Sequence, residues 1–462
     1  ATEMPTISED GTTFTFTLRE GVNFVDGSGA IVREMTADDV VYSLNRVLDP
    51  DLTPTPSPVA SAFFAAIVGA PDVLDGTATE ATGLRAIDDQ TVEIEIAAPD
   101  QSFLNVLAMP FASIVPSEFA GEDTTAFSSE PVGTGPFTLE SYTAGQGAVF
   151  VRNPHYWQED VPLVERIEYR LGIDPTSQLQ QVQAGDLDIM GDAIPPGSFT
   201  ATVNDPRYEG QIHSQVEVAT FFMSMDLSDP DSPLADVRVR QALNHAVDKE
   251  NLLRVQNGRG QIAACIFPPD LPGYDPDCNP YPYDPERARE LLAETDYPDG
   301  FETTLYTSTT DPDPLIAQSI QQDLAAIGVE AEVITQDFDT LLETIFTPGA
   351  APLASTGWFQ DFPDPSDFID PILSCASAVE NGSNSAFYCN EEVDALAAEA
   401  KGEPDQATRL ELYRGLQERI MADAPWVPLY HSTFYTMVSP RVTNFALHPV
   451  WRTDLRKFGL SE

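Results

Sequence analysis

The amino-acid sequence predicts an α/β protein that folds as two lobes, and three observations lead to this fold class. The chain has 462 residues, which exceeds one ordinary hydrophobic core and favours two or three domains. Segments of alternating apolar and polar residues, typical of half-buried strands, lie between segments whose apolar residues recur at helical spacing. A helix followed directly by a strand, which is half of a βαβ crossover, occurs at two places.

Helix start signals and strand-like alternation mark the individual elements. Thr36 followed by Asp39 resembles a capping box, and apolar residues from Val40 onward recur on one helical face. Asp284 and Pro285 supply an N-cap and a first-turn proline for the predicted helix ERARELLAET. Apolar–polar alternation predicts three strands, within residues 14–18, 92–96 and 167–171.

The two helix–strand units lie further along the chain. In TSQLQQVQAGDLDIM, Gly185 ends a predicted helix and residues 187–189 begin a strand. The clearest unit covers residues 314–334, where a helix stops at Gly328 and an alternating strand follows. Both units indicate α/β lobes.

The net charge of −51 is the strongest compositional feature of the chain. It comes from 74 acidic residues against 23 basic ones, while the hydrophobic fraction of 42% is far from the disordered class. This balance excludes a protein that binds nucleic-acid phosphates and disfavours anionic membrane surfaces. The acids are scattered rather than gathered in a tail, so we interpret them as a halophilic signature: at about 1 M salt the Debye length falls to about 3 Å and screens their repulsion.

The sequence contains no run of 18 apolar residues, so no membrane span is expected. The start, ATEMPTISEDG, has no basic region or apolar core and is not a signal peptide. We expect either that a targeting segment was removed or that the given chain starts downstream of it.

Four cysteines occur as two close pairs, Cys265 with Cys278 and Cys375 with Cys389. Neither pair has the two-residue spacing or the companion histidines of a zinc site. We therefore predict two local disulfides, which persist outside the reducing cytoplasm and contribute roughly 3 kcal/mol each in the chain-entropy model. Four buried thiols in a cytoplasmic protein remain the alternative.

The segment GWFQDFPDPSDFID, residues 357–370, is the best candidate for a binding site. It places aromatic side chains among carboxylates, and its prolines restrict the backbone. Aromatic faces attract cations and a carboxylate gives an ammonium group a charge-assisted hydrogen bond, so the segment suits an amine. The alternative is an acidic surface loop whose aromatic residues anchor it to the core.

Ten segments in order carry a resemblance to a known family. They are FTFTLREGVNFVDGSG, MTADDVVYSLNRVLDP, VGTGPFTLESY, FVRNPHYW, QVQAGDLDIM, PLADVRVRQALNHAVDKENLL, YDPERARELLAE, QSIQQDLAAIGVEAEV, GWFQDFPDPSDF and WVPLYH. Together they resemble the peptide-type solute-binding proteins of ABC transporters, extracellular solute-binding protein family 5, over nearly the whole chain. The resemblance implies a two-lobed, type II periplasmic-binding-protein-like fold with an extra subdomain on lobe one and a ligand cleft between the lobes.

The resemblance also implies domain boundaries. Residues 1–130 would form the extra subdomain, 131–221 with 441–462 lobe one, and 222–440 lobe two, with hinge crossings near 223–226 and 438–444. The opening stretch that precedes FTFTLREG in the family has almost no counterpart here, so the chain is expected to be truncated or incompletely read.

Site residues follow from the same comparison. In peptide-binding relatives an aspartate of this segment receives the ligand's α-amino group, and the matching positions are Asp361 and Asp364, with Asp364 slightly preferred. The backbone around Gly357 and Phe359 would pair with an extended peptide, and Trp358 would wall a pocket. The comparison puts three further residues near the cleft, for which a turn before the strand at residue 137 is an equally good reading: Gly133, Thr134 and Gly135.

The resulting interpretation is a non-enzymatic, extracytoplasmic subunit of an importer, either periplasmic or tethered to the cell surface. It would bind a peptide or another small amine-bearing solute, work as a monomer with ABC permease domains, and need no cofactor or metal. The same fold could instead bind a sugar, a nickel complex, haem or an opine. A hydrolase lacks support because HExxH, GxSxG and P-loop motifs are missing, and a calcium-dependent surface protein lacks a DxDxDG loop.

Overall fold

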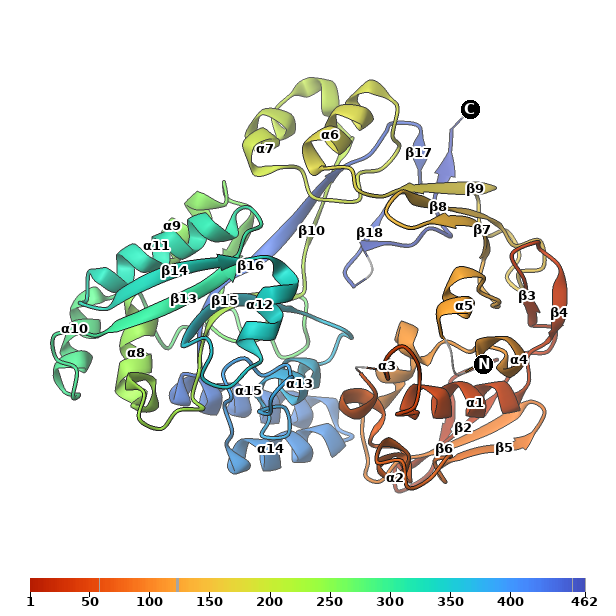
Figure 1. Cartoon of the computed structure of the whole chain (residues 1–462), viewed down its shortest axis with the longest axis horizontal. Coiled ribbons are helices and arrows are strands. Elements are labelled where there is room, and N and C mark those ends of the chain that lie inside the picture. Colours follow the sequence, from red (N-terminus) through yellow and green to blue (C-terminus); the bar gives the residue numbers. More distant parts are fainter. Residues whose placement is uncertain (58, 122–123, 451, 462) are drawn as a thin grey trace. The chain divides into compact units, whose positions relative to one another are not determined.

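The computed structural model describes residues 1–57, 59–121, 124–450 and 452–461 (Figure 1). The chain forms two compact units. The first comprises Ala1–Ile189, Val438–Ala446 and Thr453–Glu462, and the second Met190–Met437 and Leu447–Arg452. Within the described residues, no helix combines the length and apolar character needed to cross a membrane.

The first unit is built on antiparallel sheets. A four-stranded sheet has the order β1-β2-β6-β5, a three-stranded sheet the order β7-β8-β9, and β3 pairs with β4. The strands predicted within residues 14–18, 92–96 and 167–171 are confirmed as β2, β6 and β9. The bounds are β1 Thr6–Ile7, β2 Thr13–Thr17, β3 Asn23–Val25, β4 Ile31–Glu34, β5 Leu84–Asp88, β6 Thr91–Glu95, β7 Phe137–Thr143, β8 Gly147–Arg152 and β9 Arg166–Arg170.

The helices of the first unit include the one that the capping box predicted. Helix α1 spans Ala37–Leu48, and the reciprocal bonds of the capping box between Thr36 and Asp39 are present. The other helices are α2 Ala70–Leu74, α3 Phe103–Leu107, α4 Ser117–Ala120, α5 Thr124–Ser129 and α6 Pro175–Ala184. Gly185 ends α6 in the left-handed region, as expected, but the strand predicted at 187–189 is wrong: in the described chain only a single bridge forms there, between Ile189 and Val438.

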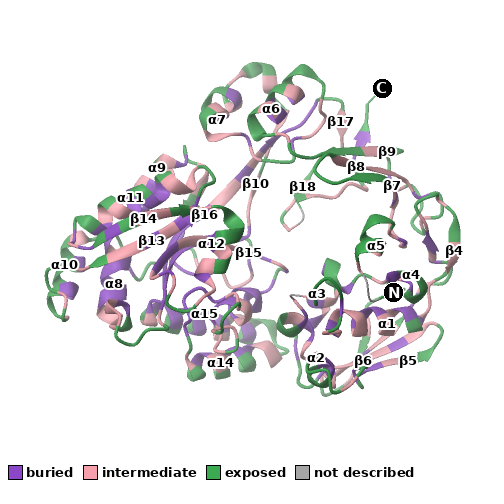
Figure 2. Ribbon diagram, in the orientation of Figure 1, coloured by how far each residue is buried: buried purple, intermediate pink, exposed green. Residues whose placement is uncertain are grey.

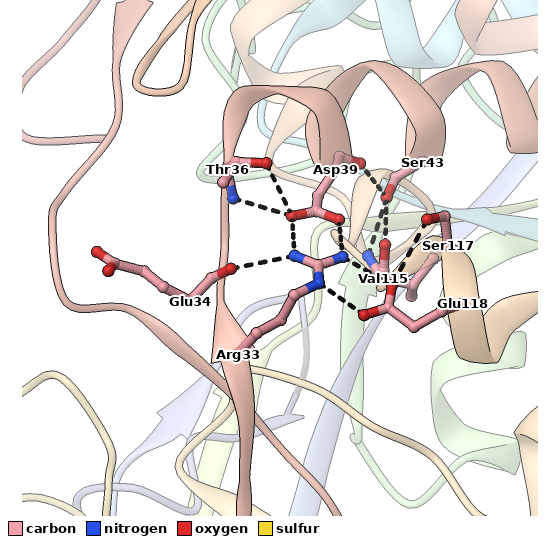
Figure 3. A network of polar contacts seen from close by, with 8 residues as sticks. All are labelled: Arg33, Glu34, Thr36, Asp39, Ser43, Val115, Ser117 and Glu118. Carbon is pink, nitrogen blue, oxygen red and sulfur yellow. Dashed lines mark hydrogen bonds and ion pairs between the residues drawn. The ribbon is translucent and has the colours of Figure 1, made fainter.

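One network of polar contacts, with a buried carboxylate at Asp39, holds three elements of the first unit together (Figure 3). The Arg33 guanidinium donates to both carboxylate oxygens of Asp39, at 2.6 and 2.7 Å, and to both of Glu118, at 2.6 and 2.7 Å. Asp39 is buried and also accepts from the main-chain N–H of Thr36 at 2.9 Å. Arg33 therefore joins β4 to the first turn of α1 and to α4.

The second unit is organised around a seven-stranded mixed sheet with the order β10-β16-β11-β15-β13-β14, in which β12 also pairs with β16. Strand β13 runs parallel to β14 and β15, and the other pairs are antiparallel. The bounds are β10 Ile212–Val216, β11 Ala219–Met225, β12 Gly260–Ile262, β13 Glu302–Ser308, β14 Glu330–Gln336, β15 Leu353–Phe359 and β16 Trp426–Met437.

Helices cover both faces of this sheet (Figure 1). Period-two alternation sends neighbouring residues to opposite faces, so Phe222 lies in one core cluster and Met223 in the other. Figure 2 shows buried residues along the central strands. One cluster includes residues of α8 Val237–Ala246, α9 Lys249–Val255, α10 Pro285–Ala293 and α11 Asp313–Ala325, and the other residues of α13 Asp370–Leu373, α14 Glu391–Gly402 and α15 Gln406–Asp423.

The predicted helix–strand unit at 314–334 is confirmed as α11, a turn at Gly328 and β14. The predicted N-cap at Asp284 is also confirmed, since its side chain accepts from the main-chain N–H groups of Glu286 and Arg287. The other α-helices and strands are α7 Pro196–Val203, α12 Phe338–Ile345, β17 Val442–Thr443, β18 Leu447–His448, β19 Arg452–Thr453 and β20 Gly459–Leu460, and the short helical turns are η1 Ala60–Phe64, η2 Pro110–Ala112, η3 Pro206–Tyr208, η4 Pro233–Ala235 and η5 Pro365–Phe368.

Both predicted disulfides are present, Cys265–Cys278 and Cys375–Cys389. Cys265 is buried in the core cluster that contains α13–α15. The bonds close loops of 13 and 14 residues, which stiffens connections that have little regular structure of their own.

The expected lobe boundaries stay a prediction, and contact density divides the chain at a different point. Residues 190–221, assigned above to lobe one, join the second unit. The reason is strand pairing, because β10 pairs with β16 and β11 lies between β15 and β16.

Candidate functional site

The candidate segment begins at the end of β15, a strand that lies between β11 and β13 in the sheet of the second unit. Gly357 lies opposite Phe221 on β11, and a Cβ atom at this glycine would lie 2.8 Å from the Phe221 ring. Only glycine therefore fits without displacing that ring. On its other side, β15 pairs with β13 only through Leu353 and Ala354, so beyond Ala354 this edge of β15 has no strand partner in the described chain.

An array of aromatic rings lies beside the end of β15. Phe221 stacks on Tyr430, with ring centroids 4.6 Å apart, and Phe359 meets Phe221 edge to face at 5.5 Å. Phe359 is 46% exposed. Trp358 is half-buried, packs against the core cluster with α13–α15, and donates from Nε1 to Asp367 at 3.4 Å.

The loop after β15 contains three carboxylates whose surroundings differ. Asp364 is buried and forms two 2.7 Å bonds to the Arg409 guanidinium, which is buried as well. Its Oδ1 also accepts from the main-chain N–H and the hydroxyl of Ser366. These contacts engage both oxygens of Asp364 and give it a structural role here.

Asp361 has the opposite character. Its side chain is half-buried, and no hydrogen-bond donor or cation contacts its carboxylate within the described residues. Burial raises the pKa of Asp361 to about 6. Of the two aspartates predicted to meet an amine, Asp361 is therefore the stronger candidate, and the assignment stays a prediction.

Asp367 is the third carboxylate, and sequence reasoning gave it no role of its own. It is fully buried, and its Oδ2 accepts from the main-chain N–H of Asp361 at 2.8 Å. Burial first, and then the nearby charges of Asp361 and Asp364, raise the pKa of Asp367 well above its usual range.

A small cavity lies next to the exposed ring of Phe359. It measures about 30 Å³ and is also lined by Gln360 and by Glu217, which is ion-paired to Arg452 at 2.9 Å. This volume suits one or two water molecules rather than a peptide. Among the described residues, no group of three His, Cys, Asp or Glu side chains is arranged to hold a metal ion.

The glycine-rich candidates Gly133, Thr134 and Gly135 lie in the first unit. Gly133 exchanges two main-chain hydrogen bonds with Val25, and the Gly135 carbonyl accepts from Asn153 at 2.7 Å. A Cβ atom would have room at either glycine. The contacts within this unit fit the turn before β7, and a ligand role for these residues stays a prediction.

Sequence reasoning missed the residues that the tertiary fold brings to the segment. Arg409 on α15 follows Asp364 by 45 residues, and Phe221 and Tyr430 come from two other strands. No local pattern identifies these partners, although strand alternation could have marked Phe221 as a residue of the sheet.

A sequence model described as "Bacterial extracellular solute-binding proteins, family 5 Middle" matches residues 1–379. The chain belongs to this family. Heme-binding protein A of Haemophilus influenzae is 32% identical over 456 residues, covering 96% of this chain and 80% of the relative. Probable di/tripeptide-binding protein 5 of Pseudomonas aeruginosa is 32% identical over 471 residues, covering 98% and 85%.

Solved structures agree with this family membership. The periplasmic binding protein DppA of Helicobacter pylori, in complex with the peptide STSA, has 26% identity and a TM-score of 0.86, covering 100% of this chain and 89% of that chain. A dipeptide binding protein of Pseudoalteromonas in complex with Met-Leu has 25% identity and a TM-score of 0.84, covering 99% and 90%. The predicted resemblance and the type II periplasmic-binding-protein fold are confirmed, and the relatives are binding proteins rather than enzymes.

Proposed function

We propose that this family 5 protein is the solute-binding subunit of an ABC importer and that it captures a peptide or a similar amine-bearing solute. The proposal of an amine-bearing ligand rests on the carboxylate of Asp361, which is half-buried and has no partner in the described chain. A carboxylate in this state loses hydration without gaining a counterion, so an ammonium group that arrives beside it is strongly favoured.

The unpaired edge of β15 supports a peptide as the solute. An extended peptide can add to such an edge as a further strand, in which main-chain hydrogen bonds give affinity and pockets sort the side chains. The rings of Phe359, Phe221 and Tyr430 would give an apolar surface beside this edge, and aromatic faces also attract cations.

We further propose that the protein works outside the cytoplasm, as a monomer that delivers its solute to ABC permease domains. The two disulfides support this location because such bonds persist in oxidising compartments. The halophilic interpretation of the charge belongs to the same proposal.

The decisive experiment compares Asp361→Asn with the wild type by titration calorimetry, using ligands identified by native mass spectrometry of the purified protein or found in a library of di- and tripeptides. Removing one partner of a buried charge pair costs about 2 to 5 kcal/mol, so affinity is expected to fall well over tenfold. Asp296→Asn, at an exposed position, is the matched control. Equal affinity of Asp361→Asn and wild type would reject the amine site, and haem or a sugar as co-purified ligand would reject the peptide.

The pH dependence of binding follows from the same carboxylate. With a pKa of about 6 in the free protein, Asp361 is ionised above pH 6 and attracts the amine fully. As the pH falls through 6 the carboxylate takes up a proton that the ligand must displace, so affinity is expected to drop by about tenfold per pH unit. Calorimetry between pH 4.5 and 8, at constant salt, measures this profile.

A further inference from the structure

Asp367 combines complete burial with an incomplete set of partners. It is 0% exposed. Its Oδ2 accepts from the main-chain N–H of Asp361 at 2.8 Å and from Nε1 of Trp358 at 3.4 Å. Its Oδ1 is buried and has no hydrogen-bond partner among the described residues. Asp367 thus contacts Asp361, which the proposed function places beside the ligand amine, and Trp358, which the family resemblance expects to wall a pocket.

The charges around Asp367 do not favour an anion. Arg409, the cation beside Asp364, is held by Asp364 through two 2.7 Å bonds and by the Ala400 carbonyl at 3.0 Å, and Lys401 is paired with Asp370 at 2.8 Å. The groups that act on Asp367 electrostatically are Asp361 and Asp364, and both carry the same sign as an ionised Asp367 would. A buried carboxylate without a counterion is costly, and such a group neutralises instead.

We propose that Asp367 is a positioning residue that works in its neutral, protonated form. Its Oδ2 fixes the main chain of Asp361 and the indole of Trp358, while the absence of charge on Asp367 leaves Asp361 as the ionised member of this pair. This inference rests on the proposed function and specifies the ligand further. Asp361 and Asp367 together carry one negative charge at neutral pH, which matches a ligand with one ammonium group. Because Asp361 and Asp367 interact, the two steps in which they lose protons describe the pair rather than either residue alone. The loss of the first proton gives the pair the single negative charge that would bind the amine.

The binding test uses two substitutions at the same position. Asp367→Ala removes the acceptor for Asp361 and Trp358 and is expected to weaken peptide binding at least tenfold. Asp367→Asn keeps a carbonyl oxygen in a neutral group of the same shape, and it is expected to recover most of the lost affinity with the pH midpoint still near 6. A deep loss in Asp367→Asn, or a midpoint displaced by a pH unit or more, would show that the negative charge of Asp367 is needed and would overturn the proposal.

A spectroscopic measurement decides the protonation state without reference to binding. Infrared difference spectra between wild type and Asp367→Asn at pH 7.5 should contain the carbonyl stretch of a protonated carboxylic acid. The same band should be present when both compared proteins also carry Asp361→Asn. A carboxylate band in its place would overturn the proposal even if Asp367→Ala fails to fold. The failure of the proposed function and the failure of this inference can be told apart. Normal binding by Asp361→Asn would reject the amine site, whereas the infrared band tests the protonation of Asp367 independently of binding.

Discussion

Breaking the ion pair between Arg409 and Asp364 from one side should be among the most destabilising single substitutions in the second unit. The perturbation is Arg409→Met, which keeps a long side chain on α15 but removes the guanidinium. In the wild type that group forms two 2.7 Å bonds to Asp364, and the two side chains are only 2% and 9% exposed. The substitution leaves the Asp364 carboxylate buried with Ser366 as its one remaining partner among the described residues.

The expected magnitude follows from this burial. Breaking a buried pair by removing one partner costs about 3 to 5 kcal/mol, because the other charge is left uncompensated. A unit of about this size loses about 2 to 4 °C in Tm per kcal/mol, so the shift should be roughly 6 to 20 °C. Adding Asp364→Asn to Arg409→Met removes the stranded charge while keeping an acceptor for Ser366, and should recover at least half of the loss.

Urea unfolding at fixed salt, followed by near-ultraviolet circular dichroism, measures the free energy of unfolding for all three proteins. The matched control is Arg419→Met on the same helix, whose partner Glu392 is exposed, and which should change stability by about 1 kcal/mol or less. If Arg409→Met were no less stable than Arg419→Met, or the double variant no more stable than Arg409→Met, the structural role of Asp364 would be refuted.

Three further predictions concern stability. Lys249 is 8% exposed, and burial lowers its pKa to about 7. The folded protein therefore loses stability as the pH falls from 10.5 toward 7, because the unfolded chain takes up a proton that the buried amine resists. Lys249→Met should stabilise the protein at pH 7 by roughly 2 to 4 kcal/mol in urea unfolding, and a loss of stability would contradict this. Arg33→Gln strands the buried Asp39 and should cost about 1 to 3 kcal/mol in the first unit; an unchanged unfolding curve would argue against that network. The Tm should rise steeply from about 0.1 M to above 1 M salt as the Debye length falls from about 10 to 3 Å, and a flat Tm would reject the halophilic interpretation.

Local patterns predicted the elements whose formation depends on residues close in sequence. The capping box before α1, the glycine stop after α11 and the alternation of β2, β6 and β9 all appear where expected. The wrong prediction, a strand at 187–189, has a local pattern too. A strand needs a ladder of paired residues as well as alternation, and within the described chain these residues form only one isolated β-bridge, between Ile189 and Val438.

In the candidate binding segment, residues 357–370, the sequence and the tertiary structure also contributed different information. By itself the sequence determined the α/β class, the two disulfides and a stiff segment rich in aromatic residues and carboxylates. Only the tertiary structure distinguished its three aspartates, because their charge states depend on groups far away along the chain. Arg409, 45 residues from Asp364, neutralises that carboxylate, Asp361 faces no cation among the described residues, and Asp367 is sealed from water. Burial and pairing set the energy of a carboxylate, and both are properties of the folded chain rather than of the residue type.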